Sequence, residues 1–213
     1  LRLLWEQFDF TNAPDLKVVA LVQLEKTVAS SRWNIAVENS GALTLNSVHF
    51  PRISGLRKSE DESLAVPVWL GQQADNPRQL LAGGDKKGKR MEWDYPGYLS
   101  LQCLAFYQKD GLGFYAACDD TNALRKSFAF WGDANGEVNY EMVHLPENST
   151  SPLNRYSLPY SAVIGTFRGD WVTAAERYRS WGTNQTWAKE SRLQKNVTPK
   201  WVAETGMWVW NRG

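Results

Sequence analysis

The stretch that decides the fold is residues 99–118, which read LSLQCLAFYQKDGLGFYAAC. Two apolar, aromatic-rich runs flank Asp110-Gly111, a dipeptide typical of a two-residue hairpin turn in which both turn positions need positive φ. With this pair at the tip, Cys103 and Cys118 face each other across the hairpin as a hydrogen-bonded pair, with Cα atoms about 5.5 Å apart. This separation permits a disulfide, which would agree with a secreted protein. Two reduced core cysteines are the alternative.

Strand-like runs continue on both sides of this hairpin through the first 165 residues. Turn signals separate them at Asn39-Ser40-Gly41, Gly83-Gly84-Asp85 and Asn135-Gly136. The runs predict strands at residues 17–24, 32–39, 43–50, 66–70, 97–108, 112–118, 127–131, 137–144 and 161–167. Pro51 is expected to end the third of these. Many short strands at this spacing predict a mainly β, antiparallel sandwich or barrel.

A helix follows, from Asp170 to Trp181. The Asp170 carboxylate is suited to cap its first turn, and Gly182 is suited to end it. An apolar face recurs at helical spacing and is expected to pack against the sandwich. Its members are Trp171, Ala174, Ala175, Tyr178 and Trp181. After a polar connection, Met207 to Trp210 predict one short buried strand.

Composition narrows the classes of function. The 213 residues are 43% hydrophobic and 22% charged, with a formal net charge of +1, an ordinary globular balance. No apolar run approaches the roughly 20 residues of a membrane span. The only basic cluster, residues 86–90, is most simply a solvated turn, whereas a nucleic-acid surface needs a broad basic stripe. We therefore expect neither a membrane nor a nucleic acid as a partner.

Three sequons, at Asn148, Asn184 and Asn196, permit N-glycosylation in a secretory pathway. Together with the possible disulfide, they predict a secreted or extracellular glycoprotein. His49 and His144 are far apart in the sequence and no ligand spacing accompanies them, so neither a metal nor another cofactor is predicted.

Aromatic residues are unusually frequent, with 11 Trp, 8 Tyr and 8 Phe. Most must fill the core, because each ring buries a large area. Exposed tryptophans also suit the C–H face of a pyranose. Glu92 and Asp94 flank Trp93 at a spacing that puts both acids on one face, and Tyr95 follows. We therefore predict that this segment reaches a sugar site, with Trp93 and Asp94 binding substrate.

The order of several segments resembles a known family. These segments are residues 47–56 (SVHFPRISGL), 95–97 (YPG), 111–115 (GLGFY) with Asp119-Asp120, 169–171 (GDW) opening a helix with 178–181 (YRSW), and the Trp-rich end. The chain resembles the N-terminal β-supersandwich, of the galactose-mutarotase-like type, in α-galactosidase-like and endo-α-N-acetylgalactosaminidase-like glycoside hydrolases. The resemblance covers nearly the whole chain, and its most specific motif is the Gly-Asp-Trp helix followed by a strand.

The resemblance implies three parts. Residues 1–167 form the sandwich, 168–199 a linking helix and connector, and 200–213 the start of a truncated (β/α)₈ barrel, a TIM barrel. Such enzymes carry two catalytic carboxylates on later barrel strands, so no catalytic residue is assigned here. Because barrel active sites lie at the C-terminal ends of strands, Trp210, Asn211 and Arg212 are predicted to line a sugar subsite. In the alternative, Trp208 or Trp210 fills the barrel core and Arg212 forms an internal ion pair.

The same sandwich resembles aldose 1-epimerases, which need two converging histidines and a glutamate. His49 and His144 are more simply structural. We therefore predict the sandwich module of a secreted glycoside hydrolase that acts on O-glycosidic bonds. Its partners would be an oligosaccharide or glycoside substrate and the remainder of the same enzyme. A stand-alone carbohydrate-binding domain without catalysis is the alternative.

Overall fold

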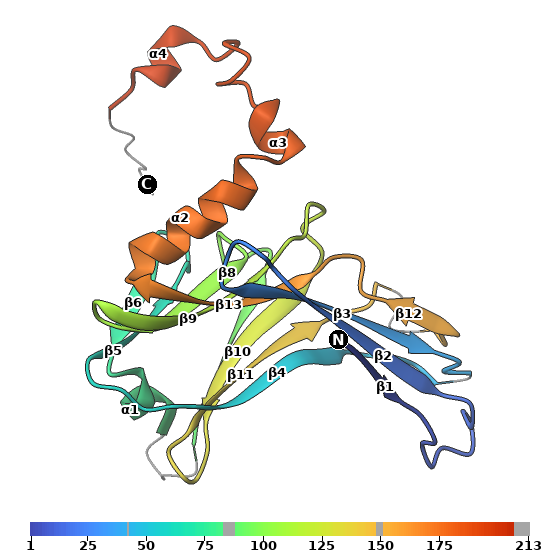
Figure 1. Cartoon of the computed structure of the whole chain (residues 1–213). Helices are drawn as coiled ribbons and strands as arrows, with labels where there is room; N and C mark the ends of the chain where they lie inside the picture. The colour runs from blue at the N-terminus through green and yellow to red at the C-terminus, as the bar shows by residue number, and fades with distance from the viewer. Residues whose placement is uncertain (42, 83–87, 148–150, 207–213) are drawn as a thin grey trace, which may run out of the picture. The chain divides into compact units, whose positions relative to one another are not determined.

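Two antiparallel β-sheets face each other across an aromatic core (Figure 1). The computed structural model describes residues 1–41, 43–82, 88–147 and 151–206. The chain divides into two compact units, Leu1–Ala175 and Glu176–Gly213. The first unit holds both sheets, which confirms the predicted antiparallel β-sandwich.

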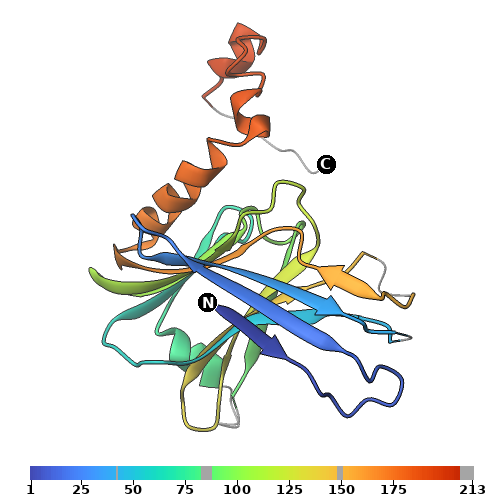
Figure 2. The same ribbon diagram turned by 45° about the vertical axis from the view of Figure 1, so that its right-hand side comes forward.

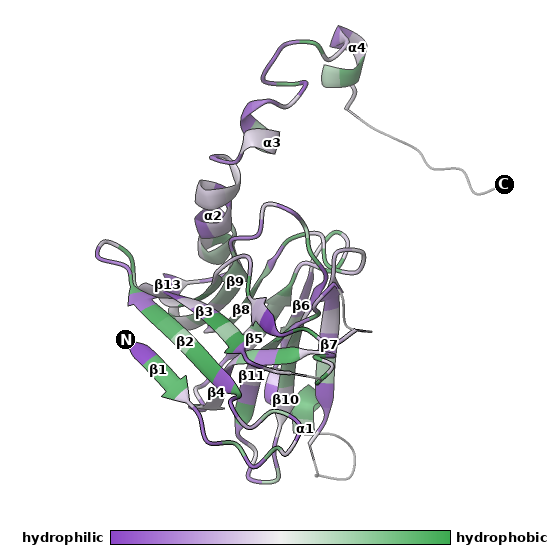
Figure 3. Ribbon diagram, turned by 90° about the vertical axis from the view of Figure 1, so that its right-hand side faces the viewer, coloured by the Kyte–Doolittle hydropathy of each residue, from purple (hydrophilic) through white to green (hydrophobic). Residues whose placement is uncertain are grey.

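The larger sheet contains nine of the described strands in the order β1-β2-β3-β13-β9-β8-β5-β6, with β12 paired to β3. Figure 2 shows β1, in dark blue, at its edge beside β2. The strands are β1 (Arg2–Trp5), β2 (Lys17–Leu24), β3 (Ser30–Glu38), β5 (Glu62–Val66), β6 (Gln72–Asp75), β8 (Cys103–Gln108), β9 (Gly111–Cys118), β12 (Arg155–Ser157) and β13 (Ala162–Gly169). Hydrophobic residues run along β1 and β2 (Figure 3), where Leu4 and Leu21 remain exposed.

The smaller sheet contains four described strands in the order β4-β11-β10-β7. They are β4 (Val48–Leu56), β11 (Val138–His144), β10 (Lys126–Gly132) and β7 (Arg90–Tyr95). A short helix, α1 (Pro77–Ala82), precedes β7. Because side chains alternate between the two faces of a strand, each of these strands sends one set of residues into the core and the other outward.

The core between the sheets is aromatic. The Phe130 ring lies 5.7 Å from Phe106 and 5.2 Å from Tyr140, and Tyr140 lies 5.2 Å from Phe114, measured between ring centroids. Trp93 belongs to the same cluster and is 6% exposed. The high aromatic content is therefore explained largely by packing, and Trp93 is unable to stack on a sugar.

Strand β4 corrects one prediction, because it does not end at Pro51. His49 pairs with Val143 and Arg52 pairs with Glu141, so Phe50 and Pro51 together oppose the single residue between those partners. This is a β-bulge. Proline is tolerated here because β4 is the edge strand of its sheet and no ladder hydrogen bond is lost.

The segment 66–70 corrects another prediction. Val66 ends β5, and the next residues turn toward β6 rather than forming a strand. Trp69 has a φ of 56° and Gly71 a φ of 101°. These left-handed conformations interrupt a strand, and they leave apolar Trp69 exposed at the turn.

The β8–β9 hairpin forms, but one residue out of the predicted register. Asp110 takes the expected positive φ of 56°, whereas Gly111 already begins β9. Cys103 therefore pairs with Ala117 rather than Cys118. Because a shift of one residue moves a side chain to the other face, the two cysteines lie on opposite faces and both are free. The structure contradicts the disulfide and agrees with the alternative of reduced, buried cysteines.

Helix α2 (Trp171–Gly182) forms where the sequence predicts it. The Asp170 Oδ1 atom accepts a 2.9 Å hydrogen bond from the backbone N–H of Val172, as expected of a cap. The second unit also contains α3 (Thr186–Lys189) and α4 (Lys200–Ala203). Within it, the Trp181 ring packs 6.2 Å from Trp187. The predicted strand from Met207 to Trp210 lies outside the described residues.

No helix in the described part of the chain combines the length and the apolar character needed to span a membrane.

Candidate functional site

The outer side of the smaller sheet carries a cluster of polar side chains around one tryptophan, which we call the polar face: His49, Arg52, Arg90, Trp131 and Glu141. The bulge in β4 creates it. His49 and Arg52 are three residues apart and would point to opposite sides of a regular strand. Because the bulge inserts one extra residue between them, both lie on the outer side, beside Glu141.

Glu141 is the centre of the polar face. Its side chain is only 5% exposed, yet it lies on the side of the sheet away from the core. The Oε1 atom is 2.9 Å from Nδ1 of His49 and 2.7 Å from a guanidinium nitrogen of Arg90. The Oε2 atom is 4.0 Å from Nε of Arg52, close enough for an ion pair but too far for a hydrogen bond.

Arg90 connects two carboxylates. It donates from Nε to Glu92 at 2.9 Å and also contacts Glu141. Partial burial alone would lower the pKa of Arg90, but the hydrogen bonds to Glu92 and Glu141 outweigh burial and the pKa is raised. Glu92 and Glu141 therefore each form an ion pair with Arg90, and they do not share a proton with each other.

Trp131 completes the polar face. The guanidinium carbons of Arg52 and Arg90 lie 4.9 and 5.5 Å from its ring centroid, within the range of a cation–π interaction. A cavity of about 380 Å³ opens among these residues. Its charged lining groups are Arg52, Arg90, Lys89 and Glu141, with His49 beside them.

A second hollow lies on the larger sheet, and we call it the apolar groove. It measures about 390 Å³ and is lined by Trp69, Leu101, Cys103, Trp171 and Ala174, among others. Trp69 is 68% exposed and Trp171 50%. Exposed large apolar residues gathered in one patch are typical of a surface that another protein segment covers.

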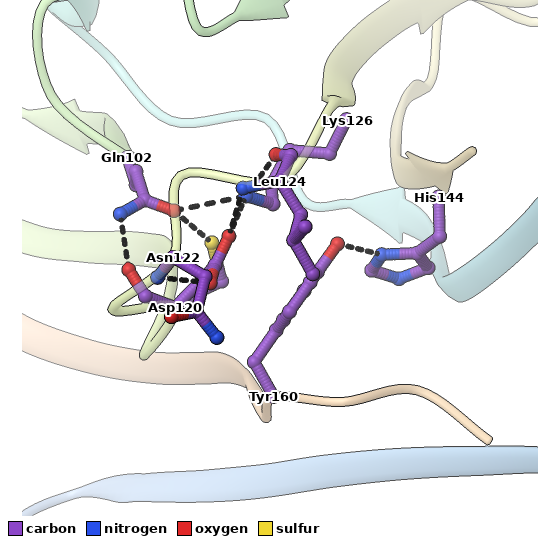
Figure 4. A network of polar contacts seen from close by, with 8 residues as sticks. Gln102, Asp120, Asn122, Leu124, Lys126, His144 and Tyr160 are labelled. Carbon is purple, nitrogen blue, oxygen red and sulfur yellow. Dashed lines mark hydrogen bonds and ion pairs between the residues drawn. The ribbon is translucent and has the colours of Figure 1, made fainter. Parts of the chain in front are cut away.

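A second polar cluster is enclosed in the core (Figure 4). Lys126 donates 2.5 Å to Asp120 and 3.0 Å to Gln102. The Asp120 carboxylate also accepts hydrogen bonds from the backbone N–H groups of Asn122 and Leu124. The side chains of Lys126 and Asp120 are 0% and 1% exposed. A substrate has no access to this cluster, so it fixes the loop before β10 rather than performing chemistry.

His144 belongs to the same interior. Its Nδ1 atom is 2.8 Å from the Tyr160 hydroxyl, and its Nε2 atom 2.5 Å from the carbonyl oxygen of Phe50. Burial lowers the pKa of His144 to about 4. His144 therefore faces the core while His49 lies on the polar face, and the two histidines do not converge as an epimerase would require.

The predicted site residues are only partly brought together. Asp94 is exposed on β7 and accepts a 2.7 Å hydrogen bond from the Ser127 hydroxyl, while its neighbour Trp93 points into the core. The predicted substrate role of Trp93 is therefore wrong. Trp210, Asn211 and Arg212 lie outside the described residues.

Two predicted glycosylation sites are accessible. Asn184 and Asn196 are exposed in the second unit, whereas Asn148 lies outside the described residues. Glycosylation of these asparagines remains a prediction. No group of His, Cys, Asp and Glu within the described ranges has the arrangement of a metal site.

Most of the polar face is not predictable from the sequence. Alternation in β11 does place Glu141 among the outward residues, and this is the one local signal for it. The partners of Glu141 come from β4 and β7, and only the strand order and the bulge bring them together. No local pattern in the sequence predicts that these residues of β4, β7 and β11 lie side by side.

Comparison with known proteins gives a family match at one end of the chain. Residues 156–213 match a domain of unknown function, DUF6259. This segment includes β13 and α2 and is less than half of the chain. No curated protein sequence matches.

Solved structures match over more of the chain than the family model does. The ligand-free α-N-acetylgalactosaminidase of Bifidobacterium bifidum matches over 92% of this chain and 30% of its own, with a TM-score of 0.59 and 14% identity. Its GalNAc complex matches with the same coverage and TM-score at 12% identity. A GH36 α-galactosidase variant of Geobacillus stearothermophilus, in complex with stachyose, matches over 83% of this chain and 26% of its own, with a TM-score of 0.52 and 11% identity.

These likenesses show the fold: the chain has the sandwich fold of one part of these glycoside hydrolases. The chain spans about 30% of the length of the first enzymes that it matches.

Proposed function

We propose that this chain is the sandwich module of a secreted glycoside hydrolase that acts on O-glycosidic bonds. The catalytic carboxylates would lie in a (β/α)₈ barrel outside these 213 residues. The single observation that carries the proposal is the fold likeness to two glycoside hydrolases over most of this chain and under a third of theirs.

The carboxylates within the chain support a non-catalytic module. Glycoside cleavage needs two carboxyl groups that flank one bond across an open site. The buried acids Glu62, Asp120 and Glu141 instead pair with Arg78, Lys126 and Arg90. Each is compensated by a cation, an arrangement suited to structure or binding rather than to proton transfer between two acids.

The apolar groove supports a partner within the same enzyme. Of its exposed tryptophans, Trp69 lies in the β5–β6 turn and Trp171 lies at the start of α2. The segment that follows β13 belongs to the part that matches the family model. We infer that the catalytic part packs on this groove and that the sandwich braces it.

Hydrolysis of aryl α-galactosides and aryl α-N-acetylgalactosaminides tests this function. We expect the natural protein to hydrolyse at least one of them, and the isolated 213-residue chain to hydrolyse none. Hydrolysis by the isolated chain, lost on Glu141→Gln, would overturn the proposal.

A pair of surface variants tests the bracing role. Trp69→Glu should lower the melting temperature of the natural protein while leaving that of the isolated chain nearly unchanged, because Trp69 is already exposed there. Leu24→Glu is the matched control, since Leu24 is an exposed apolar residue of β2 away from the groove. Equal effects of the two variants in the natural protein would contradict docking at the groove.

A further inference from the structure

We propose that the polar face is a saccharide-binding site on the sandwich itself, and that it takes a neutral pyranose. The site is distinct from the apolar groove. Groove residues such as Cys103 point outward from the larger sheet, whereas Glu141 points outward from the smaller one. Binding at the polar face therefore needs no catalytic part, and the proposal does not rest on the proposed function.

The size and chemistry of the cavity suit one sugar ring. Its volume of about 380 Å³ falls within the range of about 300–1,000 Å³ typical of small-molecule sites. The walls present donors on Arg52, Arg90 and His49 around an acceptor on Glu141. A sugar hydroxyl both donates and accepts hydrogen bonds, so it can satisfy both kinds of partner.

The arrangement around Glu141 leaves a position for such a hydroxyl. Oε1 already has two partners at 2.7 and 2.9 Å, whereas Arg52 stands 4.0 Å from Oε2. A ligand hydroxyl that donates to Oε2 and accepts from Arg52 would bridge this gap. Because His49 and Arg90 hold the carboxylate in place, little side-chain ordering is needed on binding.

The position of Glu141, rather than the net charge, favours a neutral ligand over an anion. Arg52, Arg90 and Lys89 contribute three positive charges, and Glu141 with its neighbour Glu92 contributes two negative charges. A phosphate group is negatively charged and would meet the Glu141 carboxylate at the centre of the site. Hydroxyl groups carry no charge and avoid this repulsion.

Trp131 holds the site together and reports on it. Its ring lies beside both guanidinium groups, which limits their motion and supplies an apolar wall for the C–H groups of a pyranose. A ligand in the cavity would therefore change the surroundings of the Trp131 indole N–H.

Nuclear magnetic resonance of that indole N–H in the 213-residue protein, assigned with Trp131→Phe, tests the proposal. The protein is titrated with galactose, N-acetylgalactosamine, glucose and inorganic phosphate. We expect a saturable shift with at least one of the sugars. Arg52→Ala should weaken the affinity about tenfold, the size expected for one hydrogen bond to a charged group.

Two controls make the result decisive. Arg155→Ala removes an exposed arginine of β12, which belongs to the larger sheet rather than to the sheet that carries Glu141, and should leave the affinity unchanged. Glu141→Gln should weaken sugar binding while circular dichroism shows a folded protein. The proposal is overturned if no sugar shifts the signal up to tens of millimolar, if phosphate alone shifts it, or if Arg155→Ala weakens binding as much as Arg52→Ala.

Discussion

Two charged clusters occupy opposite faces of the same four-stranded sheet, and their difference separates structure from function. Lys126 and Asp120 form a 2.5 Å ion pair on the core side. Arg90 and Glu141 form a 2.7 Å ion pair on the outer side. The distances are alike, but the first cluster is closed to solvent while the second borders a cavity of about 380 Å³.

Each of the two clusters contains an ion pair, but they differ in whether their carboxylate oxygens have all their hydrogen-bond partners within the protein and in whether a ligand can reach them. Every Asp120 oxygen has partners within the protein, and Lys126 also donates to the carbonyl oxygen of Leu124. The Oε2 atom of Glu141 lies 4.0 Å from Nε of Arg52, on a face that a ligand can reach. The inner cluster therefore fixes a loop, and the outer cluster is available to bind.

The largest expected effect comes from breaking the closed cluster. Asp120→Ala leaves the Lys126 charge buried and two backbone N–H groups without their acceptor. We expect the free energy of unfolding to fall by about 3–5 kcal/mol, measured by urea denaturation. Adding Lys126→Met should recover part of the loss, because the uncompensated charge is removed. A loss below about 1 kcal/mol would show that the cluster is not closed.

The pH dependence of stability probes the same interior through His144. Burial lowers its folded-state pKa to about 4, below the ordinary value of 6.5, so the neutral form is favoured in the folded protein. The contribution of neutral His144 to the free energy of unfolding is complete above pH 6.5. It is lost as the pH falls toward the folded-state pKa, because the unfolded state binds a proton first. Between pH 7 and pH 5 we expect a loss of about 2 kcal/mol.

His144→Gln supplies the reference for this measurement. Its amide can still donate to Phe50 and accept from Tyr160, but it does not titrate. The pH-dependent loss in the original protein should exceed that in the variant by the stated amount. Parallel stability curves for the two proteins would mean that His144 is not held neutral.

The open cluster should tolerate change that the closed one does not. Glu141→Gln keeps the size of the side chain and one acceptor oxygen, and Arg90 keeps its contact with Glu92. We expect the free energy of unfolding to fall by only about 1 kcal/mol. Urea denaturation beside Asp120→Ala measures the contrast, and equal losses would erase the distinction between the two clusters.

The smallest change in the free energy of unfolding is expected for an ordinary exposed ion pair, which serves as the reference. Arg155 is 69% exposed and lies 3.4 Å from Glu38. Arg155→Ala should change the free energy of unfolding by less than about 0.5 kcal/mol. A larger loss in urea denaturation would mean that exposed pairs matter more here than the comparison assumes.

The sequence predicted the fold where local patterns determine it. Strand β2 has the predicted bounds, and Asp170 caps α2 as expected. Alternation and turn chemistry are sufficient for these elements, because both act over a few neighbouring residues. The same patterns predicted a hairpin at Asp110, but not its register, since one residue at the turn decides which face each cysteine takes.

The candidate site was less predictable because it depends on distant residues. Trp93 and Asp94 were chosen for their chemistry, yet the pleat sends Trp93 into the core. The polar face needs β4, β7 and β11 to meet, and it needs a bulge at Phe50 and Pro51, where the sequence suggested the end of a strand. Such tertiary arrangements are not visible in the local pattern.

The intact mass of the natural protein, with size-exclusion chromatography of the same sample, decides whether this chain is part of a larger enzyme. We expect one polypeptide much larger than the 24.2 kDa of this chain, or this chain bound tightly to a second fragment. A natural protein that is a soluble monomer of 24.2 kDa would contradict the assignment to a larger glycoside hydrolase.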